Sequence, residues 1–136
     1  MKTIFLDFDG VLHSMSDYLT HPFNRLPLLE ELIDAASFDI VVSSSWRFHQ
    51  DIKVIKGRLG KVGSRVIGVT GDAVRGPHAR YQEIWAYANQ CHISDWRALD
   101  DAHWEFPPGT PELIACDPRT GLTAREVKAL HDWLHV

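Results

Sequence analysis

Asp7 and Asp9 stand two positions apart, directly after an apolar run near the start of the chain, and Gly10 follows them. Side chains alternate along a strand, so the two carboxylates would share one face if the strand continued through both. Two ionised carboxylates on one face repel, so the arrangement is reasonable if a divalent cation neutralises them, or if one works as a nucleophile and the other as an acid or base. Gly10 lets the chain turn away after the pair. The alternative is a strand end with two acidic residues before a glycine turn.

Three consecutive serines, Ser43 to Ser45, follow a short β-branched run at 38–42 and open the next helix. Hydroxyls and free backbone N–H groups at a helix N-terminus favour an anion. The same serines would also serve as an ordinary helix cap, and the two roles are compatible. Arg47 has a planar fork suited to a second phosphate contact, with a solvated position on the helix face as the alternative.

A second acidic pair, Asp100 and Asp101, ends another predicted strand, 96–101. An acidic turn is the alternative interpretation of this pair. The elements around these residues alternate between strands and helices. We expect strands at 3–8, 38–42, 65–70, 96–101 and 113–116, and helices at 28–36, 48–59, 80–89 and 123–134. This order predicts an α/β fold with right-handed crossovers, in which the strand ends lie side by side. In such an open parallel sheet, ligands bind at the carboxyl ends of the strands.

Composition sets the broad class of the protein. The chain has 136 residues, enough for one domain with its own core, and we expect residues 1–136 to form that domain. A net charge of −4 gives no general attraction to nucleic acid, so an RNA or DNA partner would have to meet a local basic patch. No apolar run approaches the roughly 20 residues of a membrane span, and we expect a cytoplasmic protein. Cys91 and Cys116 lack metal or disulfide spacing, so we expect two buried free thiols.

The segment Asp7-Phe8-Asp9-Gly10-Val11-Leu12 resembles the signature of the haloacid dehalogenase-like (HAD) phosphatase superfamily. Together with Ser-Ser-Trp-Arg, the Asp-Asp pair and the turn before the last helix, it most resembles the HAD domain of Swiss Army Knife RNA repair proteins, over Lys2 to Leu134. The resemblance implies a three-layer Rossmann-like fold of about five parallel strands with helices on both faces. It also implies an end-processing phosphatase that acts beside ligase and kinase modules.

The resemblance also implies roles for individual residues. Asp7 would be the nucleophile and Asp9 the acid/base, while Ser44, with Ser43 next, would hold the phosphoryl group. Arg80 would be the cation that stabilises the phospho-aspartate, with Arg75 in reserve. Mg²⁺ would be bound by Asp7, the main-chain carbonyl of Asp9, and Asp100 or Asp101. The candidate substrate-binding residues are Gly10, Ser43, Ser45 and Arg47. We interpret His13, directly after the signature, as a loop histidine.

Members of the superfamily often carry a cap domain over the site. Here one loop and one helix fill the segment between Asp7 and Ser44, and one helix and a strand fill the segment between Arg80 and Asp100. We therefore expect a capless, open site that accepts a bulky phosphorylated substrate, RNA ends among them. The alternatives are a non-catalytic module that binds a phosphate or a partner, and a phosphotransferase to an acceptor other than water.

Overall fold

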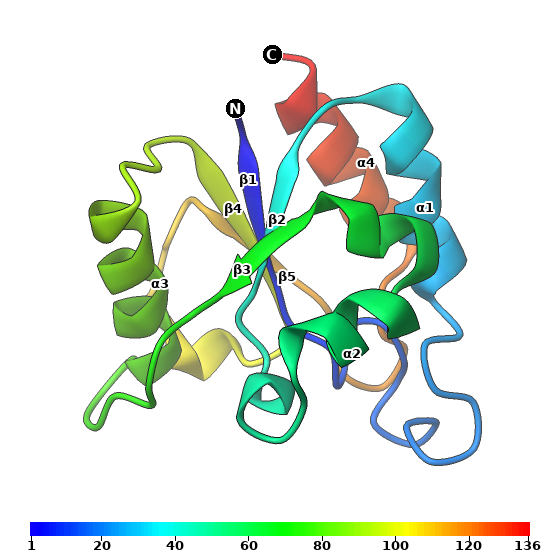
Figure 1. The fold of residues 1–136 in the computed structure, drawn as a ribbon, viewed down its shortest axis with the longest axis horizontal. Helices are drawn as coiled ribbons and strands as arrows, with labels where there is room; N and C mark the ends of the chain where they lie inside the picture. The colour runs from blue at the N-terminus through cyan, green and yellow to red at the C-terminus, as the bar shows by residue number, and fades with distance from the viewer.

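The computed structural model describes residues 1–136 and contains one open sheet of five parallel strands in the order β3-β2-β1-β4-β5 (Figure 1). The strands are β1 (Thr3–Leu6), β2 (Asp39–Val42), β3 (Val66–Val69), β4 (Trp96–Asp100) and β5 (Leu113–Ala115). Each strand predicted from the apolar runs is present, and the α/β prediction with about five parallel strands is confirmed.

β1 lies at the centre of the sheet because it pairs on both sides. Leu6 is opposite Val42 of β2 and opposite Leu99 of β4. The side chains of β1 alternate between two hydrophobic clusters: Leu6 belongs to one and Phe5 to the other. Both are fully buried, as expected for a parallel strand covered on both faces.

Helices cover both faces of the sheet, so the predicted three layers are confirmed. The helices are α1 (Leu26–Ala35), α2 (Ile52–Arg58), α3 (Ala79–Gln90) and α4 (Ala124–Leu134). Figure 1 shows α3 on one face and the other three on the opposite face. Accordingly, Ile84 of α3 packs with Phe5, whereas Leu29 of α1 and Leu130 of α4 pack in the cluster of Leu6. None of these helices has the length and apolarity needed to cross a membrane.

N-terminal caps define where α2, after β2, and α4, after β5, begin. The predicted helix over 48–59 is wrong as one element: a 3₁₀ helix, η1 (Ser45–Phe48), comes first, and α2 begins anew at Ile52. The Asp51 side chain accepts the Lys53 N–H at 2.8 Å, and this capping bond favours a new helix start over continuation. A second 3₁₀ helix, η2 (Gly60–Arg65), follows α2. In α4, the side chains of Thr123 and Glu126 form a capping box at the start of the helix.

One of the two thiols expected to be buried is not. Cys91 is exposed, because it follows the last turn of α3, while Cys116 is buried as expected. Glu83 of α3 is also buried. Its carboxylate is paired there with Arg47 at 2.7 Å, which offsets the cost of burying the charge.

The chain reverses its direction of travel across the sheet at β1. It passes from β1 through α1 to β2 and then β3, and returns through α3, on the other face, to β4. The carboxyl ends of β1 and β4 therefore flank a topological switch point, where open α/β sheets bind ligands. Asp7 follows β1 and Asp100 ends β4, so both acidic pairs of the sequence reach this edge.

Candidate active site

Three carboxylates meet at the switch point. Asp7, Asp100 and Asp101 each offer an oxygen, and these oxygens lie within 4.8 Å of one another. Asp7 and Asp100 are buried and Asp101 is half-buried. An all-oxygen donor set of this charge fits a hard divalent cation such as Mg²⁺, which binds through a few carboxylates and keeps several waters.

The electrostatics of the cluster also favour a cation. Burial, and next the charge of Asp100, raise the pKa of Asp7 well above its ordinary value. Burial raises the pKa of Asp101 as well. Ionised Asp7 is therefore costly unless positive charge is nearby, and a bound divalent ion would supply that charge.

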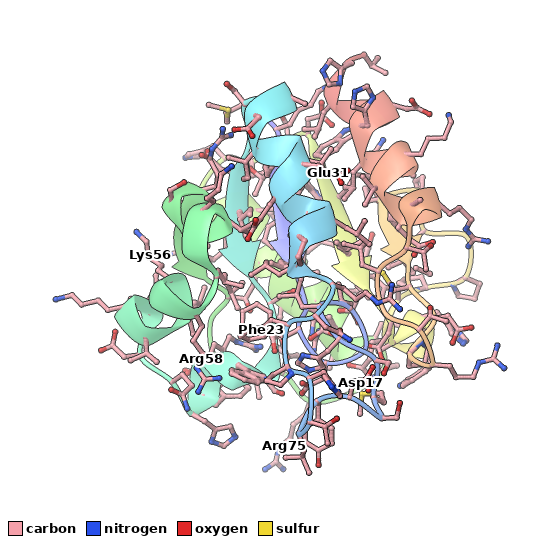
Figure 2. All side chains as sticks on the ribbon, turned by 90° about the vertical axis from the view of Figure 1, so that its right-hand side faces the viewer. Asp17, Phe23, Glu31, Lys56, Arg58 and Arg75 are labelled. Atoms are coloured by element: carbon pink, nitrogen blue, oxygen red, sulfur yellow. The ribbon has the colours of Figure 1, made fainter.

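Arg80 supplies one positive charge to the cluster. It lies in the first turn of α3, and its Nη1 is 2.6 Å from Oδ2 of Asp100 and 3.5 Å from Oδ1 of Asp7. The backbone N–H of Arg80 donates to Glu105 of the short 3₁₀ helix η3 (His103–Glu105), which fixes the start of α3. Arg75, the reserve candidate, is exposed on the loop before α3 and has no ion pair (Figure 2). The structure thus brings Arg80, and not Arg75, to the acidic cluster.

Asp9 lies apart from the three clustered carboxylates. β1 ends at Leu6, so Asp7 and Asp9 are not on one continuous strand, and the shared face does not form. Oδ1 of Asp9 accepts a hydrogen bond from His13 Nε2 at 2.7 Å and one from Trp46 Nε1 at 3.2 Å. The two aspartates of the signature therefore have different surroundings, one facing the acidic cluster and the other facing two N–H donors.

The three serines also differ in their surroundings. The Ser44 hydroxyl accepts the Trp46 N–H at 3.2 Å and caps η1. The Ser43 hydroxyl is buried and has no hydrogen-bond partner, although it directly follows β2 beside the end of β1. Ser45 is exposed at the start of η1. Ser43 is therefore the serine of the three whose hydroxyl is both buried and without a protein partner.

Arg47 has neither of the surroundings expected for it. Its side chain is 3% exposed, and its guanidinium donates to the carbonyls of Ser43, Ser44 and Gly71 and to Glu83. These bonds leave little of the fork for a phosphate. Arg47 instead ties the end of β2 to the loop after β3 and to α3.

Position 10 requires a glycine because the Asp101 side chain approaches it closely. The φ of Gly10 is +80°, a region that L side chains rarely adopt, and a Cβ at this position would overlap the Asp101 carboxylate. The glycine of the signature thus gives the second acidic pair access to Asp7. Its role as a substrate contact stays a prediction.

Three residues around the candidate site were missed by sequence reasoning. His13 is fully buried against Asp9 instead of lying on an open loop, Trp46 donates to Asp9, and Glu83 anchors Arg47. The positions of His13 directly after the signature and of Trp46 directly after the serines were the available signals. Periodicity alone gave no reason to direct either side chain at Asp9.

One of three comparisons with known proteins finds a match for this chain. No curated protein and no solved structure matches the chain. A family model described as the HAD domain in Swiss Army Knife RNA repair proteins matches residues 3–127. The match extends from β1 into α4 and includes all of the residues described above. The chain therefore belongs to the family of HAD domains found in Swiss Army Knife RNA repair proteins.

Proposed function

We propose that this protein is a Mg²⁺-dependent phosphatase that hydrolyses phosphomonoesters through a phospho-aspartate on Asp7. The observation that carries the proposal is the separation of the two signature carboxylates. Asp7 lies with Asp100, Asp101 and Arg80, where a cation fits, while Asp9 lies outside the cluster with its own hydrogen-bond donors. One carboxylate is thus suited to attack phosphorus, and the other is suited to move protons.

In the first step, an Asp7 oxygen attacks phosphorus in line and the bond to the leaving oxygen breaks. Asp9 gives its proton to that leaving oxygen. In the second step, Asp9 takes a proton from water, the water oxygen bonds to phosphorus, and the bond to Asp7 breaks. Mg²⁺, held by Asp7, the main-chain carbonyl of Asp9, and Asp100 or Asp101, would offset negative charge on the transferring group.

Two further residues are proposed to contact that group. Arg80 would offset its charge, because its Nη1 already lies 3.5 Å from Asp7. We assign the phosphoryl contact to the hydroxyl of Ser43 in preference to that of Ser44. The Ser44 hydroxyl is occupied by the Trp46 N–H, whereas the Ser43 hydroxyl is buried without a partner. A buried hydroxyl left unpaired is costly, and a phosphoryl oxygen would satisfy it.

The substrate is proposed to be the phosphorylated end of an RNA strand or another bulky phosphate ester. Only the loop after β1 and α1 separate β1 from β2, and α3 is the one helix between β3 and β4. Because so few elements fill these two connections, we propose a capless site whose strand edge is open to a large substrate. The family, whose members are HAD domains of RNA repair proteins, supports the choice of RNA ends as the first substrates to test.

The deciding experiment measures release of inorganic phosphate from an aryl phosphate and from 3′- and 5′-phosphorylated RNA oligonucleotides, with Mg²⁺ or with EDTA. Wild type should release phosphate only with Mg²⁺, Asp7→Asn should be inactive, and Asp9→Asn should be strongly impaired on the oligonucleotides. Preference for one RNA end would identify the substrate class. Binding of phosphorylated RNA with no release from any substrate would overturn the phosphatase and favour a binding module.

A further inference from the structure

His13 is a buried polar side chain whose two ring nitrogens are both hydrogen bonded. The residue is 0% exposed, Nε2 lies 2.7 Å from Oδ1 of Asp9, and Nδ1 lies 3.1 Å from the backbone nitrogen of Phe23. A backbone N–H can only donate, so Nδ1 must be the acceptor, and the proton of the neutral ring is on Nε2. The ring is therefore held as a donor directed at Asp9.

Phe23 holds the His13 ring in this orientation. The two rings stack with centroids 5.5 Å apart and an interplanar angle of 27°, and Phe23 also contacts the Trp46 ring at 5.3 Å. Phe23 has a φ of 60°, which is uncommon for a bulky residue. Figure 2 shows it in the loop between β1 and α1. Backbone strain of this kind persists where the surroundings demand it, and here it accompanies contacts to both side chains that bond Asp9.

Trp46 is the second donor to Asp9 and comes from η1. Its Nε1 lies 3.2 Å from Oδ1 and 3.3 Å from Oδ2 of the carboxylate. The Asp9 side chain remains 36% exposed, so part of it stays open between the two donors. The carboxylate is thus fixed in direction and accessible at the strand edge.

We propose that His13 is a positioning residue that orients Asp9 for proton transfer to the leaving oxygen of the substrate. The proposal rests on the proposed phosphatase function, because it concerns the acid/base of that reaction. Without its His13 donor, Asp9 would be misdirected as an acid. The resulting loss of rate should be largest when the leaving oxygen is strongly basic. A leaving group that departs without a proton should be little affected.

The test compares two substrates through kcat/KM, which reports the steps up to formation of phospho-Asp7. One is a nucleoside monophosphate, whose alkoxide needs protonation, and the other is 2,4-dinitrophenyl phosphate, whose leaving group does not. His13→Leu should lower kcat/KM at least about 30-fold for the nucleoside monophosphate, chiefly through kcat, and by no more than about threefold for the aryl ester. His13→Gln, which keeps an N–H donor, should restore most of the loss.

Controls separate positioning from a structural role. If His13→Leu lowers kcat/KM equally for both substrates, and also lowers the Mg²⁺ affinity and the melting temperature, the positioning role is overturned. If wild type hydrolyses neither of these substrates nor the phosphorylated RNA oligonucleotides, the proposed function itself fails, and the role of His13 fails with it. Should His13→Leu not fold, His13→Met takes its place, because its flexible side chain adapts to irregular space.

A second measurement does not depend on activity. The ¹⁵N chemical shifts of the His13 ring in the metal-free wild-type protein should report the Nε2-protonated tautomer. They should keep that pattern in Asp9→Asn, because the Phe23 N–H bond to Nδ1 remains. A ring protonated on Nδ1 in wild type would overturn the inferred donor and the proposal built on it.

Discussion

The guanidinium of Arg80 donates from Nη1 to Oδ2 of Asp100 at 2.6 Å, between a helix start and a strand end that lie far apart in the sequence. The Asp100 side chain is 1% exposed and that of Arg80 is 16% exposed. A buried ion pair is costly to break on one side, because the remaining charge is left without a partner. The same guanidinium reaches Asp7, so Arg80 joins the acidic cluster of β4 to the proposed nucleophile.

Replacing Arg80 should therefore damage activity much more than replacing its nearest alternative. We expect Arg80→Gln to lower kcat about 100-fold, because charge on the transferring group would lose a positioned donor. Arg75→Gln is the matched control, since Arg75 is exposed and makes no ion pair, and it should retain activity within about twofold. Steady-state kinetics of both variants on one substrate provide the comparison. Equal losses would contradict the assignment to Arg80.

Ser43 and Ser44 should separate into a functional and a structural residue. Ser43→Ala should leave stability nearly unchanged and lower kcat/KM about tenfold or more, because its hydroxyl has no protein partner. Ser44→Ala should cost about 1 kcal/mol of unfolding free energy through loss of the η1 cap, with little effect on kcat/KM. Denaturant unfolding and kinetics on the same preparations measure both. The reverse pattern would return the phosphoryl contact to Ser44.

Replacing Gly10 should disturb the acidic cluster, and Gly109 offers a matched control position. Both have positive φ, +80° and +76°, but a Cβ at Gly109 would meet nothing within 4 Å, whereas one at Gly10 would meet the Asp101 carboxylate. Alanine at either position should cost about 1 kcal/mol of stability through backbone strain. Only Gly10→Ala should also weaken Mg²⁺ binding, by about tenfold, because Asp101 must move. Calorimetric titration with Mg²⁺ tests this, and unchanged affinity in Gly10→Ala would exclude the steric explanation.

The stability of the metal-free protein should depend on pH through Asp7. Because burial and Asp100 raise its pKa in the folded protein, the folded state binds more protons than the unfolded state above the ordinary value of 3.8. The stabilisation is complete below that value and is lost as pH rises through the folded pKa. The melting temperature of wild type in EDTA should therefore fall more between about pH 4 and pH 8 than that of Asp7→Asn.

Thermal unfolding of both proteins across this range provides the measurement. Saturating Mg²⁺ should raise the melting temperature of wild type most at the upper end of the range, since the ion binds the ionised cluster of the folded state. Parallel curves for wild type and Asp7→Asn would show that Asp7 does not govern the pH dependence.

The arrangement of the elements could be predicted from local patterns. Apolar runs located all five strands, and the alternation of strands and helices gave a parallel sheet, which brought Asp7 and the Asp100 pair to one edge. The Thr123 capping box was visible because its two partners are three residues apart. The break before α2 was missed because the apolar spacing of Ile52, Ile55 and Leu59 locates the helix but does not locate its first residue.

Contacts between distant segments could not be predicted in this way. Trp46 reaches Asp9, and Arg47 reaches Glu83, only after the crossovers have set the strands side by side. Such bonds depend on side-chain direction in the folded chain, which periodicity does not specify. The sequence therefore identified most of the candidate chemistry, while the partners that orient Asp9 required the structure.

The central place of β1 also governs when the site can form during synthesis. β1 emerges from the ribosome before β4, yet β4 is its hydrogen-bonding partner along one whole side and begins only at Trp96. Until then the strand that precedes Asp7 has an unpaired edge, which favours chaperone binding and aggregation. A chain cut short before β4 would carry the signature without a folded sheet. We thus expect the nascent chain to lack catalytic activity and to remain prone to aggregation until most of it has been translated.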